Sequence, residues 1–271
     1  MNSITNEYSD EELKKIAANI RIKTIESIYN AGSGHSGGSL SIADILTVLW
    51  FNSMNWNNNS DENDKFILSK GHAVPVLYAV YCEMGLISKE ELLGLRSIGS
   101  RLQGHPDRTK LKYLDAGTGA LGQGLSISIG YVLANKLKGL ERKVYCIVGD
   151  GELQEGQIWE AAMYAGANLG NELVCIVDNN RLQNETWVKD TLNMYDIEKK
   201  WQSFNWNTLV INGHDITEIR QALQEKSFSK NRPLAIIANT IKGKGVSFME
   251  NDNAWHGKVI SEECYVQAIE E

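Results

Sequence analysis

The sequence has little cysteine and no long apolar run. Its four cysteines, Cys82, Cys146, Cys175 and Cys264, are far apart and form no C-x-x-C pair, so buried thiols are a better interpretation than a disulfide framework or a cysteine-based metal site. No apolar stretch approaches the roughly 20 residues of a membrane-spanning helix. The start, MNSITNEYSDEE, is polar and acidic, unlike a signal or transit peptide. We therefore expect a cytoplasmic protein.

The sequence also lacks a basic run or stripe. It has 27 Lys and Arg against 34 Asp and Glu, a net charge of −7, which disfavours binding to nucleic acid or to an anionic membrane surface. Because the hydrophobic content of 42% over 271 residues is ordinary for a globular protein, we expect one domain over 1–271. Its N-terminal helical segment is expected at about 9–60.

Apolar and helical segments alternate from residue 66 onward. Five runs read as strands buried on both faces: FILS, VYCIVGD, LVCIVDN, TLVING and PLAIIANT. The helices between or beside them are AVPVLYAVYCEMG, LGQGLSISIGYVLANKLKG, GQIWEAAMYAGANLG and ITEIRQALQEK. This alternation predicts an α/β fold with a doubly wound, mainly parallel sheet and helices on both faces. Ligands of such folds collect at the carboxyl ends of the strands.

The stretch GSGHSGGS, residues 32 to 39, has the G-x-G-x-x-G spacing of dinucleotide-binding folds. That fingerprint requires a preceding strand, whereas apolar residues here recur at helical intervals from Leu13 to Ile28. Ser41 and Asp44 have the spacing of a capping box that opens a second helix. The stretch is therefore a loop between helices that carries His35, and a nicotinamide site is not indicated.

All five histidines have a glycine neighbour. Glycine suits loops in which the backbone approaches a ligand closely, so we expect His35, His72, His105 and His256 to converge on a site as hydrogen-bonding groups and proton carriers. His214, in the turn INGHD, reads as an ordinary turn residue. Zinc is disfavoured because no histidine has a second ligand at metal-binding spacing.

Two strand ends predict a metal-assisted diphosphate site. Asp150 follows VYCIVG, and Asn180 lies thirty residues later, after LVCIVDN. One helix joins these strands into a parallel unit, so both side chains should emerge together as hard oxygen ligands for Mg²⁺, completed by phosphate oxygens. The glycine-rich turn DAGTGALGQG, at 115–124, could present backbone N–H groups to a ligand at a helix start. A plain turn is the alternative.

Taken together, these motifs resemble the transketolase family. GDGELQEG with Asn180 is similar to a thiamine diphosphate signature, and GSGHSGGSL, LSKGHA, QGHP, TGALGQG and WHG follow in the family's order over about residues 10 to 260. The resemblance covers only the family's first domain, which implies the N-terminal subunit of a split transketolase. With thiamine diphosphate and Mg²⁺, such an enzyme transfers a two-carbon ketol unit from a ketose to an aldose, as in the pentose phosphate pathway.

The resemblance also implies roles for particular residues. Asp150, Asn180 and the carbonyl of Leu182 would hold Mg²⁺; His72, Gly151 and His256 would contact the diphosphate, and Gly119, Ala120 and Leu121 would line the cofactor. His35, His105 and His256 would face the sugar. Glu155 would lie at a subunit contact near the cofactor, or else be a solvated carboxylate at a helix start. Lys242 and Lys244 are expected either near the diphosphate or in solvent.

The expected partner is a C-terminal subunit with the pyrimidine-binding domain, in a two-plus-two assembly to which Trp50, Trp159 or Trp187 could contribute an apolar contact. In the family that domain supplies the glutamate that activates the cofactor and most of the arginines that hold the sugar phosphate.

Two alternatives stay open, and the sequence departs from the family pattern at two positions. A deoxyxylulose-phosphate synthase or 2-oxoacid dehydrogenase subunit would share the metal site, and a non-catalytic cofactor-binding module is the non-enzyme alternative. Ser36 and Ala120 stand where the family often has proline, so the loop around His35 is expected to be less rigid, and the sugar substrate is left undetermined.

Overall fold

The computed structural model describes residues 8–57, 62–225 and 228–271. Their centre is a five-stranded parallel sheet in the order β1-β2-β3-β5-β4. The strands are β1 (Lys65–Leu68), β2 (Val144–Gly149), β3 (Leu173–Asn179), β4 (Asn207–Asn212) and β5 (Leu234–Asn239). All five coincide with the predicted apolar runs, and the parallel α/β fold is confirmed.

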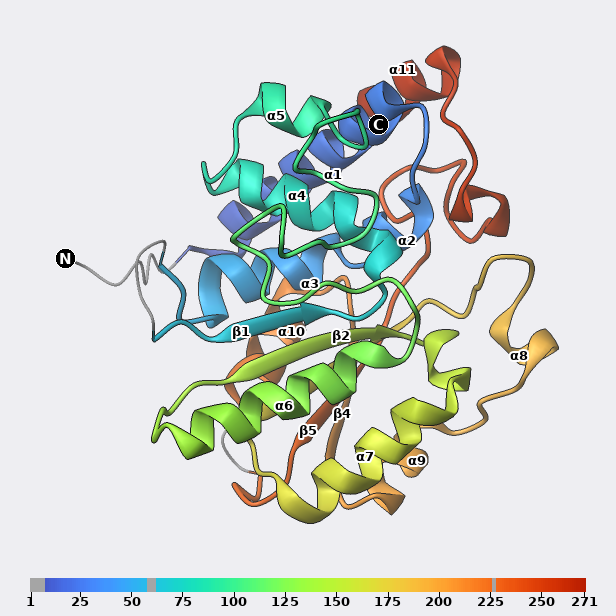
Figure 1. The fold of residues 1–271 in the computed structure, drawn as a ribbon. Coiled ribbons are helices and arrows are strands. Elements are labelled where there is room, and N and C mark those ends of the chain that lie inside the picture. The colour runs from blue at the N-terminus through green and yellow to red at the C-terminus, as the bar shows by residue number, and fades with distance from the viewer. Residues whose placement is uncertain (1–7, 58–61, 226–227) are drawn as a thin grey trace.

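Helices cover both faces of the sheet (Figure 1). One face carries α1 (Asp10–Ala31), α3 (Ala43–Val48), α4 (Val74–Glu83), α5 (Lys89–Leu93), α10 (Ile216–Gln224) and α11 (Glu262–Glu270). The other carries α6 (Gln123–Leu137), α7 (Gly156–Asn168) and α9 (Ile197–Ser203). Short elements complete the chain: α2 (Ser36–Leu40), the π-helix η1 (Leu49–Ser53), η2 (Gly71–Ala73), η3 (Glu152–Gln154), α8 (Val188–Thr191) and η4 (Asn253–His256).

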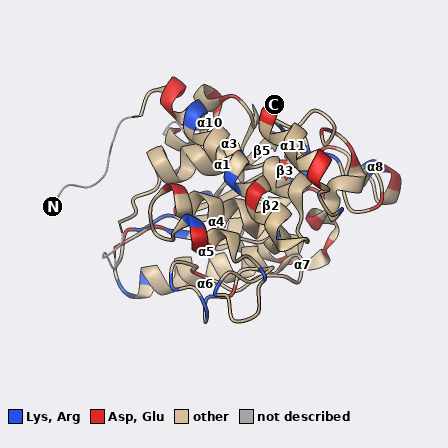
Figure 2. Cartoon of the chain, turned by 90° about the horizontal axis from the view of Figure 1, so that it is seen from above, with Lys and Arg blue, Asp and Glu red and all other residues tan. Residues whose placement is uncertain are grey.

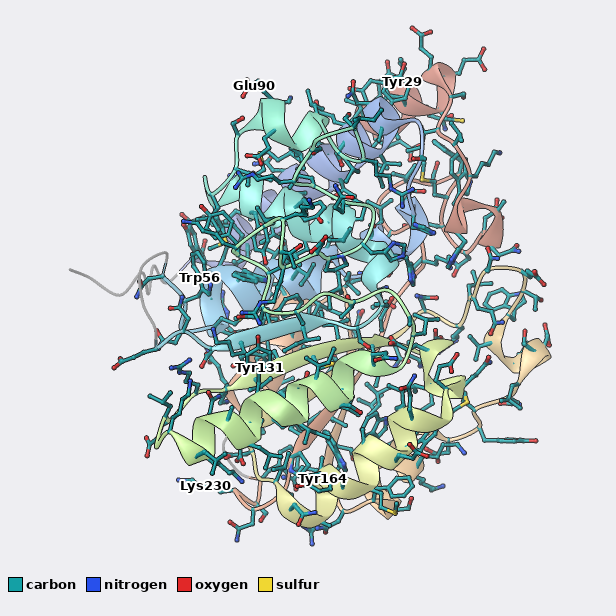
Figure 3. All side chains as sticks on the ribbon, in the orientation of Figure 1. Tyr29, Trp56, Glu90, Tyr131, Tyr164 and Lys230 are labelled. Carbon is teal, nitrogen blue, oxygen red and sulfur yellow. The ribbon has the colours of Figure 1, made fainter. Side chains whose placement is uncertain are left out.

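Strands β1, β2, β3 and β5 are apolar because each of their faces is buried in a separate core. The edge strand β4 is partly exposed, with Val210 48% exposed, so the expectation of burial on both faces is wrong for the run TLVING. In β2, Tyr145 and Ile147 join the core under α1 and α4, while Cys146 and Val148 join the core under α6 and α7. Side chains fill both layers between sheet and helices (Figure 3). This arrangement explains why the four strands buried on both faces show continuous apolar runs without polar alternation.

The first helix begins and ends where its sequence predicts. Ser9 and Glu12 form a reciprocal capping box, and Gly32 ends the helix with a φ of 61°. Near that end Tyr29 stacks on Tyr265 of α11, with ring centroids 4.2 Å apart. The C-terminal helix is thereby held against α1.

The predicted capping box at Ser41 and Asp44 is wrong. The helix α3 begins at Ala43, and no side chain caps it. The Ser41 hydroxyl donates to Gly38 and to the Asp178 carboxylate, while Asp44 pairs with Arg21. Both side chains are buried and have partners elsewhere in the fold, so neither is available to the helix start.

The three tryptophans expected at a subunit contact differ in exposure. Trp50 is 5% exposed and lies edge-on to Trp56, Phe66 and Tyr81, so it belongs to the core and the expectation for it is wrong. Trp159 is partly buried, and its Nε1 donates to Leu153. Trp187 is 37% exposed and is the one of the three that an interface can readily cover.

Within the described ranges, no helix has the length and apolar character to cross a membrane. All four cysteines are free thiols, and Cys146 and Cys175 are fully buried on neighbouring strands. Acidic and basic positions are interspersed along the chain (Figure 2).

Two helical glycines provide a matched test of this packing. A Cβ at Gly166 of α7 would lie 1.7 Å from the carbonyl oxygen of Phe204, whereas a Cβ at Gly130 of α6 would meet nothing within 4 Å. We expect Gly166→Ala to lower the free energy of unfolding by about 2–3 kcal/mol and Gly130→Ala to raise it by about 0.5–1 kcal/mol. Urea unfolding followed by circular dichroism measures both, and a well-tolerated Gly166→Ala would contradict the described contact of α7 with residue 204.

Candidate active site

The ends of β2 and β3 form the floor of a cavity at the carboxyl edge of the sheet. Gly149 and Asp178 are register partners, so the loops that follow them run side by side and carry Asp150 and Asn180 to the same place. The cavity has a volume of about 310 Å³. Its lining includes most of the predicted cofactor and metal residues: His72, Leu121, Asp150, Gly151, Glu155, Asn180, Leu182 and His256.

Four histidines from four separate loops gather beside this cavity. The ring of His35 lies 5.2 Å from that of His72, 5.2 Å from that of His256 and 6.2 Å from that of His105, centroid to centroid. His214 lies apart. Its Nδ1 is 2.8 Å from Asp44, and its Nε2 accepts the Ile241 N–H, so it holds two loops together.

Burial makes these histidines weak bases. It lowers the pKa of His35 to about 4, with Arg96 adding to the effect, and that of His256 to about 3, with Lys242 adding. The pKa of His72 is also well below its ordinary value, because of burial and then of Lys70. The rings are therefore neutral at pH 7 and can accept or donate hydrogen bonds. In the described parts of the chain, the buried Nδ1 of His35 has no hydrogen-bond partner.

A buried ion pair, which the sequence analysis missed, lies beneath the cavity. Lys70 Nζ is 2.5 Å from the Asp178 carboxylate and 2.7 Å from the Gly38 carbonyl. Asp178 also accepts hydrogen bonds from Ser41, Asn180 and Thr240. Burial alone would raise the pKa of Asp178, but the charge of Lys70 and the hydrogen bonds from Lys70, Thr240 and Ser41 outweigh burial and hold the pKa below its ordinary value. The aspartate is therefore ionised, and it orients the Asn180 amide.

A second missed residue, Glu152, joins three loops of the cavity. Its carboxylate accepts hydrogen bonds from the Ser69 hydroxyl, the Gly122 N–H and the Gly149 N–H, and Ser69 in turn accepts the Gly124 N–H. The N–H groups of Gly122 and Gly124, expected to face a ligand, are therefore bonded within the protein, and the expectation is wrong for these two. A glutamate in a loop sequence gives no sign of such distant partners.

The chemistry of the donors at Asp150 fits a divalent cation. Burial, and then the charge of Asp178, raises the pKa of Asp150 to about 7, so a bound cation would stabilise its ionised form. The Asn180 side-chain oxygen and the Leu182 carbonyl lie on the neighbouring loop and add hard oxygen donors. These donors are one carboxylate, one amide and one backbone carbonyl. In the described residues there is no group of three His, Cys, Asp or Glu side chains that could hold a metal.

Of the two lysines left undecided, Lys242 lines the cavity and Lys244 does not. Lys242 is 2% exposed, and its Nζ donates to the Leu182 carbonyl at 3.2 Å and lies 3.0 Å from Nδ1 of His256. Burial, and then the nearby Lys70, lowers the pKa of Lys242 to about 8. Lys244 pairs with Glu250 near the surface.

Two predicted cofactor residues lie in an adjoining hollow. Gly119 and Ala120 line a second space of about 630 Å³ together with His105. A Cβ at Gly119 would lie 3.6 Å from the His105 ring. The glycine-rich turn therefore places Leu121 in the first cavity and its earlier residues beside His105.

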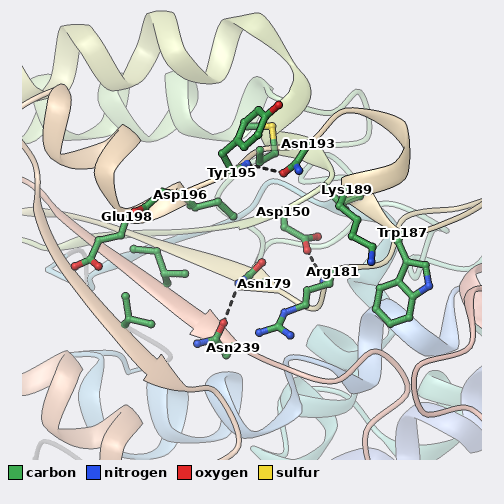
Figure 4. A pocket seen from close by; sticks show the side chains of 15 residues that line it. Asp150, Asn179, Arg181, Trp187, Lys189, Asn193, Tyr195, Asp196, Glu198 and Asn239 are labelled. Atoms are coloured by element: carbon green, nitrogen blue, oxygen red, sulfur yellow. Dashed lines mark hydrogen bonds between the residues drawn. The ribbon is translucent and has the colours of Figure 1, made fainter.

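A further cavity of about 500 Å³ lies beyond the Asn179–Arg181 loop, at the ends of β3, β5 and β4 (Figure 4). Asp150 borders it, and the Asn179 amide donates to the Asn239 side chain at 2.8 Å across its floor. Trp187, Lys189 and Tyr195 surround its mouth. None of the four clustered histidines lines it.

Comparisons with known proteins agree on one family. The profile of the transketolase thiamine diphosphate binding domain matches residues 12–270. Mouse transketolase is 39% identical over 267 residues, which are 96% of this chain and 42% of the relative, so the chain spans about two fifths of that protein. The transketolase of Campylobacter jejuni superposes with a TM-score of 0.88 at 32% identity, over 95% of this chain and 42% of the other.

Two relatives have nearly the same length as the chain. The 6-deoxy-6-sulfo-D-fructose transketolase subunit SqwG of Clostridium sp. (strain MSTE9) is 39% identical over 96% of both chains. One of the apulose-4-phosphate transketolase subunits of Phocaeicola vulgatus is 37% identical over 93% of this chain and 90% of the relative.

The depressed histidine pKa values predict how the chain responds to acid. Between the ordinary pKa of 6.5 and the folded values of about 4 and about 3 for His35 and His256, the unfolded chain binds protons that the folded chain does not. We expect the contribution of these two histidines to stability to be lost as pH falls through this window, whereas Asp150, whose folded pKa is raised to about 7, contributes in the opposite direction. Ring resonances of both histidines in NMR spectra should be constant from pH 8 to pH 6, and half-protonation of either near its ordinary pKa would contradict the described burial.

Proposed function

The chain belongs to the family of transketolase thiamine diphosphate binding domains, and from this premise we propose that it is the diphosphate-side subunit of a transketolase. With a partner subunit it would transfer a two-carbon ketol unit from a ketose to an aldose. The observation that carries this proposal is the convergence of Asp150, Asn180, Leu182, His72 and His256 on one cavity at the carboxyl edge of the sheet, with the ring of His35 packed beside those two histidines.

The donors of this cavity support binding of thiamine diphosphate with Mg²⁺. Asp150, Asn180 and the Leu182 carbonyl would hold the metal, which links the diphosphate to a buried carboxylate. His72, Gly151 and His256 would face the diphosphate, while Gly119, Ala120 and Leu121 would lie along the cofactor. The chemistry that the cofactor supplies when bound is the nucleophilic carbon that cleaves the C2–C3 bond of the ketose.

The histidines would act on the sugar. Neutral His35, His105 and His256 can hydrogen-bond the substrate hydroxyls and hold or move a proton as the carbon–carbon bond breaks or forms. Because burial lowers their pKa values, the rings are neutral at pH 7 and can accept or donate hydrogen bonds to the substrate hydroxyls. Protonation of the rings at low pH would remove that capacity.

A partner subunit is proposed because the described cavity offers the cofactor's aminopyrimidine no buried carboxylate that is not already engaged. Three carboxylates line the described cavity, those of Asp150, Glu152 and Glu155. The first belongs to the metal site, and the second is bonded to three loops. Glu155 is exposed at the rim, where a subunit contact would cover it. Two relatives of the same length are named as transketolase subunits, which supports a pyrimidine-binding partner in a two-plus-two assembly.

The finer assignments are proposals of the same kind. Ketol transfer, as in the pentose phosphate pathway, is favoured over 2-oxoacid decarboxylation because the similar proteins named above are transketolases. The substrates would be small sugars or sugar phosphates. Four unpaired cysteines support a reducing compartment such as the cytoplasm.

Removal of the Asp150 carboxylate should abolish Mg²⁺-dependent binding of thiamine diphosphate. The cation would lose its one charged protein ligand. Without the bound cation, the diphosphate would face the negative charge of Asp178. Calorimetric titration of Asp150→Ala in the reconstituted complex measures this effect. Asp190→Ala, which removes an exposed carboxylate from α8, is the control and should bind as the unaltered chain does. Equal affinity in both variants would defeat the metal assignment.

Ketol transfer should require the partner. The purified chain is expected to show no turnover with a ketose phosphate donor and an aldose phosphate acceptor until a pyrimidine-binding subunit is added, because half of the cofactor site is missing. Coupled assays of aldose release detect the transfer. Substantial turnover by this chain alone would overturn the split-enzyme proposal, and consumption of 2-oxoacids in place of ketose cleavage would overturn the transferase proposal.

A further inference from the structure

A cavity of about 690 Å³ lies at the amino edge of the sheet, opposite the candidate active site. It is bounded by η1, the end of α6, the loop before β2 and the end of α10. In Figure 1 this edge is on the left, where β1 and β2 begin. The site is therefore separated from the histidine cluster by the length of the strands.

Several buried hydrogen-bonding groups at this cavity have no partner. Asn135 is 6% exposed, yet its Nδ2 makes no hydrogen bond in the described chain. The same holds for Nε of Arg142 and for the hydroxyl of Ser53, and all three residues line the cavity. A buried polar group without a partner costs about 1–3 kcal/mol, so three at one cavity indicate a ligand that supplies acceptors.

The charges around the cavity favour an anion. Four basic residues line it: Lys136, Arg142, Lys143 and Lys230, the last labelled in Figure 3. Three acidic residues, Asp64, Glu141 and Glu172, also line it. Two of these are engaged, because Glu172 pairs with Lys136 at 2.6 Å and Asp64 accepts backbone N–H groups of residues 55 and 143. No ion pair is described for Arg142, Lys143 or Lys230.

The rest of the wall is apolar enough for an organic group. Val132, Leu140 and Leu223 border the cavity, and Tyr145 adds an aromatic ring. The volume of the cavity is within the range of about 300–1,000 Å³ typical of small-molecule sites. The π-helix that carries Ser53 is a further indication, because such turns are rare and concentrate at functional sites.

We propose that this cavity binds a small phosphate monoester. Unpaired donors of Asn135, Arg142 and Ser53 would bind the phosphate oxygens, which are acceptors with strong charge-assisted hydrogen bonds, and the apolar wall would contact the organic part. A carboxylate offers fewer oxygens to these donors and is expected to bind more weakly. The site goes beyond the proposed ketol transfer and does not depend on it.

Phenyl phosphate is a suitable probe, since it combines one phosphate with a rigid apolar body. Calorimetric titration into the full chain should give saturable binding, with and without saturating thiamine diphosphate and Mg²⁺. Arg142→Gln and Asn135→Leu are each expected to weaken binding by about tenfold or more, the effect of one lost charge-assisted or buried hydrogen bond. Lys138→Gln, an exposed lysine near the same end of α6 that does not line the cavity, is the matched control and should bind as the unaltered chain does.

Comparison probes identify the chemistry that is bound. Both comparison probes should bind more weakly than phenyl phosphate: inorganic phosphate lacks the apolar part, and benzoate has a carboxylate, which offers fewer acceptor oxygens to the donors. Thermal unfolding of both variants without ligand checks that they are folded, and if one is unfolded the other carries the test. The proposal is overturned if phenyl phosphate does not saturate, if Arg142→Gln and Asn135→Leu bind it normally, or if benzoate binds equally well. Loss of binding on saturation with thiamine diphosphate would place the probe in the cofactor cavity and would also overturn it.

Discussion

The buried pair of Lys70 and Asp178 is the contact on which the candidate active site depends. Its members are 2% and 0% exposed, and they connect α2, the end of β1, the end of β3 and the segment after β5. An isolated buried ion pair contributes little or destabilises a fold. Here the remaining donors and acceptors are engaged as well, so breaking either partner would leave an uncompensated charge beneath the cavity and release Asn180 from the orientation it needs.

Negative charge beneath the cavity creates the requirement for cations. Asp150, Glu152 and Asp178 are all buried there, in a region that we propose holds a diphosphate. Lys70 and Lys242 supply part of the compensation, yet burial, and then the charge of Asp178, still raises the pKa of Asp150 to about 7. A divalent metal at Asp150 and Asn180 would complete the balance, which connects the proposed metal dependence to the electrostatics of the loops.

The sequence predicted the features that depend on local pattern, and missed those that depend on distant partners. Two-sided burial makes β1, β2, β3 and β5 continuous apolar runs, so these strands were predictable, and the short apolar run of the edge strand β4 was found although it is partly exposed. The register of β2 and β3 then placed Asp150 beside Asn180. Lys70, Glu152 and Asp178 gave no such signal, because a lysine after a strand or an aspartate inside one reveals nothing about its partner. The same limit explains the errors at Ser41 and Trp50, whose burial is set by other segments.

Three of the glycines beside the histidines pack closely against other parts of the protein. This packing is a role that the sequence analysis did not anticipate, in addition to the expected approach of the backbone to a ligand. A Cβ at Gly71 would lie 2.8 Å from the Thr118 hydroxyl oxygen, and one at Gly213 would lie 2.5 Å from the Thr240 methyl group. At Gly104 the neighbour is the Arg96 guanidinium, 2.7 Å away. Glycine therefore lets these loops pack tightly. The clearest case in the cluster is Gly71, where a Cβ would also lie 3.0 Å from the Thr118 backbone, so a methyl group there would shift the segment that carries His72.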